Sequence, residues 1–370
     1  MIYWGKTRQP RQPRKERAIC MGINDHGSKM CANYDYAYEA ELREKFRKRA
    51  PKRVFDAHFH LSPDEIHTVP AEQVFDTWVE DTEYYLGEGC LKGGLVMGNP
   101  SRFKSVEALD IDRAFAYKCA DEHEGYVNGL VTRPWDDPAY TEEWIRTHPK
   151  IAAIKPYRSY ARCEDTYEAD ITDYAPEWMW ELAEKYGLVM MIHLSHYTDV
   201  LRHPRNIEQI RYLSQKYPNS KIILAHCGMG HNPYKMRDGL AHIKDLPNVW
   251  MDCGGISEPM AIVYCLKELG HEKIMFATDG YRFALGDNGR CMPAGGNFFG
   301  IVRPTIVDSP DWPPDYKYTP VRNLVEQMQA LYEAGDLLGL TERQWDDIFY
   351  NNAAKLFYPI LERRLAEVSQ

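Results

Sequence analysis

Four short apolar segments that each end in a residue able to bind a metal ion are the feature that most constrains this fold. The first begins at residue 54 and ends in His58 and His60; three later segments end in His193, His226 and Asp279. A histidine that closes a buried strand needs partners for its ring nitrogens, so core positions normally avoid it. Parallel barrels and sheets place ligands and catalytic groups at the carboxyl ends of their strands. The pattern therefore predicts that these side chains share one edge of a parallel sheet.

The spacing of the histidine pair has a simple geometric consequence on a strand. Side chains alternate with a period of two, so His58 and His60 project from the same face and can both bind one ion. Alone, the pair is a weak signal, because hydrogen-bonded or surface histidines also occur at this spacing. The later strand ends supply the support that the pair by itself lacks.

The rest of the chain alternates between strands and helices. Helices are expected over residues 176–186 and 259–269, since each has proline in its first turn and glycine just past its end. The strand and helix repeats predict a (β/α)8 barrel. An open doubly wound sheet is the alternative, but it usually carries a glycine-rich turn where residues 56–60 stand. The eight candidate strands end near Ala57, Met97, Val131, Lys155, Ile192, Ala225, Asp252 and Thr278.

Extensions are expected at both ends of the barrel. Residues 1–52 form a basic arm and a helix over 35–49, which we expect to be solvated, and residues 53–370 form the barrel. The segment 286–318, rich in glycine, proline and aspartate, is expected to be a long loop after the last strand that acts as a lid or an oligomer contact. Thr341 and Gln344 predict a capping box, and the C-terminal helix that follows is expected to pack on the barrel.

Composition excludes several classes of protein. The chain has 45 basic and 54 acidic residues, a formal net charge of -9, which argues against a nucleic-acid partner. We find no apolar segment long enough to span a bilayer and no secretory signal, so we expect no membrane association. The 9 cysteines lack a CxxC pair and indicate reduced thiols, which predicts a cytoplasmic protein.

Taken together and in order, these motifs resemble the amidohydrolase superfamily. They are most similar to its amidohydrolase-2 (amidohydrolase-related) branch, which includes aminocarboxymuconate-semialdehyde decarboxylase-like proteins. The resemblance extends from about Val54 to Phe357 and is specific for the superfamily, not for a substrate. It rests on the segments 56–60, 154–156, 192–193, 224–228, 277–279 and 352–357.

The resemblance implies one divalent cation and a catalytic pair. Zinc is preferred, with manganese or iron as alternatives, because imidazoles and a carboxylate suit all three ions. Asp279 and His226 are the expected catalytic residues, and His226 is either a free acid or base or a ligand of a second metal. We favour the free imidazole, since a second metal needs a carboxylated lysine and only Lys155 is placed to supply it. The expected ligands are His58, His60, His193 and Asp279.

Several other side chains near strand ends are candidates for positioning or binding. Asp56 is expected either to orient the ligands or to be an ordinary carboxylate at the start of a strand. Lys155 is expected to be a buried ammonium paired with a carboxylate, or else to be carboxylated or to bind substrate. Arginines can grip a substrate carboxylate through a planar fork, and Arg282 and Arg290 are preferred over Arg133 and Arg158. The full substrate-binding prediction is Arg282, Arg290, Tyr157 and Lys155.

Three functions follow as hypotheses. The first is a hydrolase that uses metal-activated water on a small amide or lactone bearing a carboxylate. The second is a metal-dependent, non-oxidative decarboxylase of a small carboxylic acid; it is weakened because residues 226–230 lack the Gly-Glu pair that follows this histidine in several similar decarboxylases. The third is a non-catalytic binding barrel. We expect a small-molecule substrate and a homo-oligomer.

Overall fold

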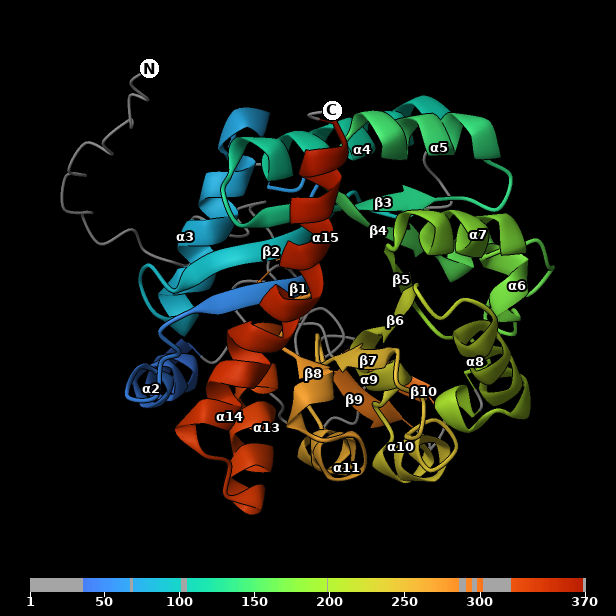
Figure 1. The fold of residues 1–370 in the computed structure, drawn as a ribbon. Helices are drawn as coiled ribbons and strands as arrows, with labels where there is room; N and C mark the ends of the chain where they lie inside the picture. The colour runs from blue at the N-terminus through green and yellow to red at the C-terminus, as the bar shows by residue number, and fades with distance from the viewer. Residues whose placement is uncertain are drawn as a thin grey trace, which may run out of the picture.

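A ring of parallel strands forms the centre of the molecule (Figure 1). The structure is a computed structural model, and it describes residues 36–66, 69–100, 105–197, 199–285, 291–294, 298–301 and 321–368. The eight strands of the main sheet pair in chain order and are all parallel. They are β1 (Val54–His60), β2 (Leu91–Met97), β3 (Tyr126–Thr132), β4 (Ile151–Pro156), β5 (Val189–Ile192), β6 (Lys221–Leu224), β7 (Val249–Asp252) and β8 (Ile274–Met275).

Two backbone hydrogen bonds bring the end of the sheet back to its beginning. The N–H of Ala57 donates to the carbonyl of Phe276 at 3.0 Å, and the N–H of Asp279 donates to the carbonyl of His58 at 2.8 Å. The ring is therefore nearly closed, which confirms the predicted (β/α)8 barrel. β1 extends three residues beyond its predicted end near Ala57, so both histidines of the pair lie on the strand itself.

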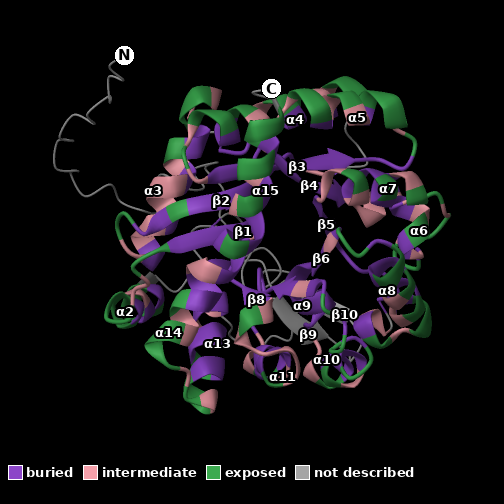
Figure 2. Ribbon diagram, in the orientation of Figure 1, coloured by how far each residue is buried: buried purple, intermediate pink, exposed green. Residues whose placement is uncertain are grey.

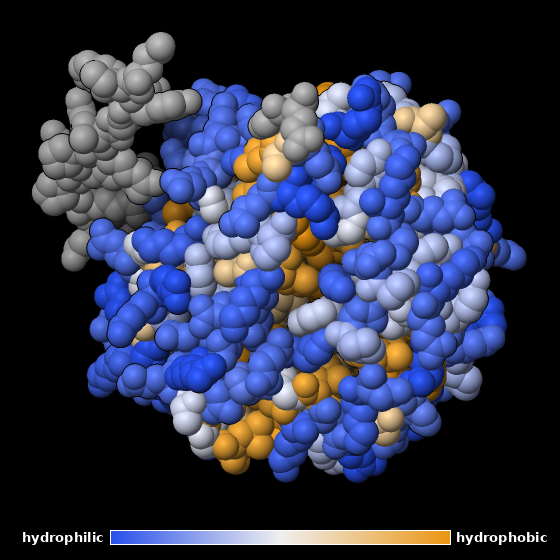
Figure 3. Space-filling view, viewed as in Figure 1, coloured by the Kyte–Doolittle hydropathy of each residue, from blue (hydrophilic) through white to orange (hydrophobic). Residues whose placement is uncertain are grey.

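Helices surround the strands, so the strands are buried on both faces while the helices keep an exposed side (Figure 2). Polar side chains dominate the surface seen in Figure 3, and hydrophobic side chains show mainly in a central band. The outer layer contains α3 (Val74–Leu86), α4 (Val106–Glu122), α5 (Pro138–Thr147), α6 (Ile171–Tyr174), α7 (Glu177–Tyr186), α8 (Pro204–Lys216), α10 (Pro233–Leu240) and α11 (Pro259–Leu269).

Local sequence signals set the ends of several helices. α7 ends at Gly187, which adopts the left-handed conformation (φ 54°) and donates its N–H to the carbonyl of Ala183. α11 begins at Pro259 and ends before Gly270. Short α14 (Glu342–Asp346) begins at the predicted capping box of Thr341 and Gln344. These helix boundaries confirm the sequence-based predictions.

Additional helices extend both ends of the barrel. α2 (Tyr36–Arg47) precedes β1, while α13 (Asn323–Leu338), α14, a π-helical turn (Asp347–Asn351) and α15 (Asn352–Val368) follow β8. Phe357 of α15 stacks on Phe55 of β1 with ring centroids 5.5 Å apart, which seats this helix against the barrel. No helix among the described residues has the length and apolar character needed to cross a membrane.

The predicted long loop over 286–318 lies mostly outside the described residues. Within it the structure describes a short antiparallel pair, β9 (Cys291–Ala294) and β10 (Phe298–Ile301). The basic arm before α2 also lies outside the described residues. The lid, oligomer and arm predictions therefore remain predictions.

Candidate metal and catalytic site

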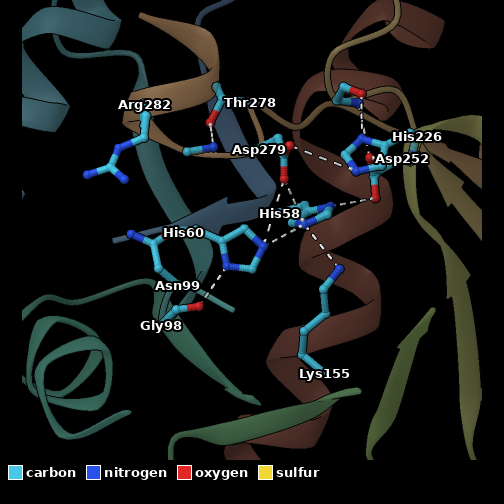
Figure 4. Close-up of polar contacts among 12 residues, drawn as sticks. His58, His60, Gly98, Asn99, Lys155, His226, Asp252, Thr278, Asp279 and Arg282 are labelled. Atoms are coloured by element: carbon cyan, nitrogen blue, oxygen red, sulfur yellow. Dashed lines mark hydrogen bonds and ion pairs between the residues drawn. The ribbon is translucent and has the colours of Figure 1, made fainter. Parts of the chain in front are cut away.

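Three of the predicted ligands converge where β1 ends and where the chain leaves β8 (Figure 4). The Nε2 atoms of His58 and His60 lie 3.1 Å apart. Oδ1 of Asp279 lies 3.2 Å from Nε2 of His58 and 3.8 Å from Nε2 of His60. These side chains form a group whose candidate ligand atoms all lie within 4.8 Å of one another. The predicted convergence of groups distant in the chain is therefore present for this trio.

The hydrogen bonds at the opposite ring nitrogens indicate which nitrogen faces the group. Nδ1 of His58 lies 3.1 Å from Oδ2 of Asp252, and Nδ1 of His60 lies 2.8 Å from the carbonyl of Gly98. A carbonyl or an ionised carboxylate only accepts hydrogen bonds, so both Nδ1 atoms must carry the proton. Each neutral ring then directs the lone pair of Nε2 towards Asp279. Two lone pairs and a carboxylate oxygen facing one point are the donor set that a divalent cation requires.

Burial keeps these rings neutral. It lowers the pKa of His58 and His60 well below the ordinary range, and the positive charge of Lys155 lowers both further. Burial raises the pKa of Asp279, whereas Lys155 opposes this shift. Neutral imidazole is the form of histidine that binds metals. The electrostatic environment is thus consistent with metal ligation.

His226 approaches the group from the next part of the rim. Its Nδ1 lies 2.8 Å from the carbonyl of Gly254, so its Nε2 also carries the lone pair, and it lies 3.9 Å from Oδ2 of Asp279. Burial lowers the pKa of His226 as well. A neutral His226 can therefore accept a proton at Nε2 but cannot donate one from that atom.

A left-handed turn, labelled α9 (Ala225–Met229), presents His226 to the site. His226, Cys227 and Met229 have φ values of 56°, 51° and 61°. Left-handed geometry costs about 1–2 kcal/mol for each residue other than glycine. The N–H of His226 donates to Oδ1 of Asp252 at 3.1 Å, which helps to hold the turn. Strain of this kind tends to occur at functional sites, where the surrounding structure compensates for it.

His193 lies beside this group and not inside it. Its ring centroid is 5.3 Å from that of His226, and its Nδ1 lies 3.2 Å from the carbonyl of Leu194. Burial lowers the pKa of His193 well below the ordinary range, and the positive charge of Arg158 lowers it further. The structure thus places His193 next to His226, outside the trio of His58, His60 and Asp279. Its role as a ligand remains a prediction.

Asp252 is a candidate functional residue that the sequence-based prediction missed. Its Oδ2 faces Nδ1 of His58, and its Oδ1 accepts the backbone N–H groups of His226 and Gly254. One buried carboxylate therefore orients a candidate ligand and the turn that carries His226. A signal was present, since Asp252 closes the apolar strand Val249–Asp252 as the predicted ligands close theirs.

Asp56 joins β1 to the chain that follows β8. It accepts hydrogen bonds from the hydroxyl of Thr278 at 2.6 Å and from the N–H groups of Thr278 and His58. Burial raises the pKa of Asp56 to about 8, opposed by these hydrogen bonds. These partners lie on both segments that carry ligands, so Asp56 fastens β1 to the segment that contains Asp279.

The predicted substrate-binding residues have different surroundings. Nζ of buried Lys155 lies 3.2 Å from Nε2 of His58, and burial lowers the pKa of Lys155. The ring of Tyr157 lies 5.0 Å from that of His193. Nε of Arg282 lies 3.8 Å from Oε1 of Glu65, and the arginine side chain is 59% exposed. Arg290 lies outside the described residues.

Gly280 allows Asp279 and His60 to approach each other, and its replacement provides a test of the site. Gly280 has φ 96°, and an added Cβ would lie 2.5 Å from the carbonyl oxygen of His60. We expect Gly280→Ala to displace one of these ligands and to lower the free energy of unfolding by about 2–4 kcal/mol, combining left-handed strain with overpacking. Urea unfolding and metal content per chain measure both effects.

Gly339→Ala is the matched control for this substitution. Gly339 also has a positive φ of 64°, but nothing lies within 4 Å of the position of an added Cβ. The Gly339→Ala substitution should lower the free energy of unfolding by only about 1 kcal/mol, the strain of the left-handed conformation. It should leave metal content unchanged. Equal metal content in both variants would contradict the placement of Gly280 against the ligands.

Fold and site together define a class, a (β/α)8 barrel whose rim carries a buried histidine–carboxylate group suited to a metal ion. The family model described as Amidohydrolase (Amidohydro_2) matches residues 55–358. The chain therefore belongs to the amidohydrolase family, in its amidohydrolase-2 branch, and is an enzyme of the amidohydrolase superfamily. This confirms the resemblance found in the sequence motifs. The family is metal-dependent.

Comparison with solved structures finds similarities at low sequence identity. An amidohydrolase from Burkholderia multivorans, solved with bound hepes and with bound Zn, has a TM-score of 0.51 at 11% identity, over 83% of this chain and 99% of that chain. A 5-carboxyvanillate decarboxylase from Sphingomonas paucimobilis has a TM-score of 0.47 at 13% identity, over 83% and 99%. A dihydroorotase from Campylobacter jejuni has a TM-score of 0.46 at 16% identity, over 83% of this chain and 84% of that chain. No curated protein matches the chain.

Proposed function

We propose that the protein is a metal-dependent hydrolase of a small amide or lactone that carries a carboxylate. The observation that carries this proposal is the position of Asp279 between the pair His58 and His60 on one side and His226 on the other. Its Oδ1 faces the Nε2 atoms of His58 and His60, and its Oδ2 faces Nε2 of His226 at 3.9 Å. A single carboxylate can therefore contact the metal-binding group and a free imidazole at the same time.

The residues present fit a divalent metal, with zinc preferred because imidazole and carboxylate ligands suit it. When bound, such a cation supplies Lewis acidity, which polarises a carbonyl and makes water a nucleophile at neutral pH. His58, His60 and Asp279 would hold it, and His193 beside them is the further ligand that we propose. Asp252 and the carbonyl of Gly98 keep the two β1 histidines in the tautomer that ligation requires.

Proton transfer is the task of Asp279 and His226. Asp279 would accept the proton of the attacking water at Oδ2, because its Oδ1 faces the ligand histidines His58 and His60. Nε2 of His226 accepts the proton in turn, since its lone pair points to Oδ2 of Asp279. The protonated imidazole can then donate to the oxygen or nitrogen that leaves. The hydrogen bond from Nδ1 to the carbonyl of Gly254 orients the ring for this donation.

Decarboxylation is the competing function within the same family. The turn after His226 contains Cys227, Gly228, Met229 and Gly230, so it brings no second carboxylate to the rim. For this reason hydrolysis remains our proposal.

Metal removal combined with product analysis tests the proposal. We expect dialysis against a chelator to abolish acid release from carboxylated lactones and amides, measured in a pH-stat, and added zinc to restore it. The same substrates and a panel of small carboxylic acids are assayed for carbon dioxide. Carbon dioxide without net hydrolysis would replace our proposal with a decarboxylase, and full turnover by the metal-free protein would exclude both functions.

A further inference from the structure

Arg158 occupies an unusual position just after β4. It begins the single helical turn Arg158–Tyr160, two residues beyond the end of the strand. Its guanidinium carbon lies 4.3 Å from the ring centroid of Tyr167 and 4.7 Å from that of Tyr197. Aromatic rings that contact a guanidinium hold its orientation without neutralising its charge.

This guanidinium has no carboxylate partner among the described residues. Its Nε is buried and makes no hydrogen bond, and its side-chain hydrogen bond goes to the phenol of Tyr197. Buried polar groups normally find partners, and an unpaired one calls for an explanation. Every other arginine in the described part of the chain that is not exposed forms an ion pair with a carboxylate: Arg43, Arg113, Arg133, Arg211, Arg322 and Arg364.

Arg158 also lies close to the candidate metal site. The ring of Tyr157, the preceding residue, lies 5.0 Å from the ring of His193, and the ring of Tyr197 lies 6.5 Å from it. In agreement with this placement, the positive charge of Arg158 contributes, after burial, to the lowered pKa of His193. The unpaired charge therefore lies on the side of the rim where His193 and His226 stand.

From this arrangement we infer that Arg158 is the residue that binds the carboxylate of the substrate. This assignment replaces the preference for Arg282, whose charge already has Glu65 within 3.8 Å. The inference rests on the proposed function for the reacting part of the substrate, but carboxylate binding itself requires no turnover. The substrate is then a small molecule whose carboxylate pairs with Arg158 while its amide or lactone carbonyl reaches Asp279.

Binding of a simple carboxylate to the full-length protein tests the inference. The probe is 4-fluorobenzoate, observed by fluorine NMR, and its neutral counterpart 4-fluorobenzamide reports binding that does not involve the carboxylate. We expect the wild-type protein to prefer the carboxylate. Arg158→Gln should weaken its binding at least tenfold, since a hydrogen-bonded charge is lost. The affinity of Arg158→Lys for 4-fluorobenzoate should lie between those of the wild type and Arg158→Gln, because lysine keeps the charge but lacks the planar fork.

Arg202→Gln is the matched control, because Arg202 is exposed and already pairs with Asp199. It should leave binding of both probes unchanged. Thermal unfolding of each variant separates lost binding from lost folding, and the wild-type preference for the carboxylate needs no variant at all. Measurements on the chelator-treated protein exclude direct binding of the probe to a metal.

Two results would overturn the assignment. One is a wild-type protein that binds 4-fluorobenzoate and 4-fluorobenzamide equally well, and the other is an Arg282→Gln variant that loses carboxylate binding while Arg158→Gln keeps it. Failure of the proposed hydrolysis gives a different pattern, with carboxylate binding that still depends on Arg158 but no acid release from any substrate.

Discussion

Replacing Asp279 with asparagine is expected to lower kcat by about 10²–10⁴-fold, the usual contribution of a positioned proton acceptor. Asparagine has nearly the same shape, so the backbone hydrogen bond from position 279 to the carbonyl of His58 should persist. The amide cannot accept the proton of the attacking water, and it carries no charge towards the lone pairs of His58 and His60. Steady-state kinetics with the best substrate of the lactone and amide panel measures the effect.

The control for this variant is Asp245→Asn. Asp245 is exposed and pairs with Arg211 at 2.7 Å, so the same chemical change occurs far from the rim. Its activity should match that of the wild type. Thermal unfolding should show both variants folded at the assay temperature. An Asp279→Asn enzyme that retained wild-type kcat and metal content would remove Asp279 from both of its proposed roles.

The largest expected effect on stability lies outside the candidate site, at a buried ion pair between α2 and the start of α13. Replacing Glu39 with alanine is expected to lower the free energy of unfolding by about 3–5 kcal/mol, because it leaves a buried charge without its partner. Glu39 accepts from the guanidinium and the N–H of Arg322, and from the hydroxyl of Tyr85 at 2.7 Å. Arg322 is only 2% exposed and cannot regain water. Urea unfolding measures the loss.

Glu41→Ala, two residues further along the same helix, is the control because Glu41 is exposed. It should change stability by less than about 0.5 kcal/mol. A double variant, Glu39→Leu with Arg322→Met, removes both charges and should recover much of the loss, since hydrophobic replacement of a buried pair is often neutral. If Glu39→Ala unfolded at the same urea concentration as Glu41→Ala, the pair would contribute nothing to the docking of α2.

Local signals explain how much of the fold could be predicted. The end of α7 at Gly187 and the start of α14 at Thr341 depend on residues within a few positions of each other. Both helix boundaries can therefore be predicted from the local sequence. The apolar runs that precede His193 and Asp279 are likewise local patterns, although β8 itself ends at Met275, before its predicted end near Thr278. The strand Val249–Asp252 also ends in a residue able to bind a metal, but the sequence analysis predicts only a strand end there.

The interactions that complete the site have no such local signature. Nδ1 of His60 meets the carbonyl of Gly98, and Nδ1 of His226 meets the carbonyl of Gly254; backbone acceptors of this kind occur at every residue. Similarly, the choice between Arg158 and Arg282 depends on which of them already has a carboxylate nearby. That depends on the positions of Glu65 and of two tyrosines, not on the arginines themselves.

The sequence by itself determined the barrel, the rim on which the polar strand ends meet and the amidohydrolase family, because each depends on periodicity, spacing or a short motif. Only the tertiary structure decided which ring nitrogens face Asp279, that Asp252 holds both His58 and the His226 turn, and that Arg158, among the described arginines that are not exposed, has no acidic partner. The physical reason is that tautomers and ion pairs are set by neighbours across the closed ring of strands. Those neighbours are fixed when β8 returns to β1, and residue identity alone does not specify them.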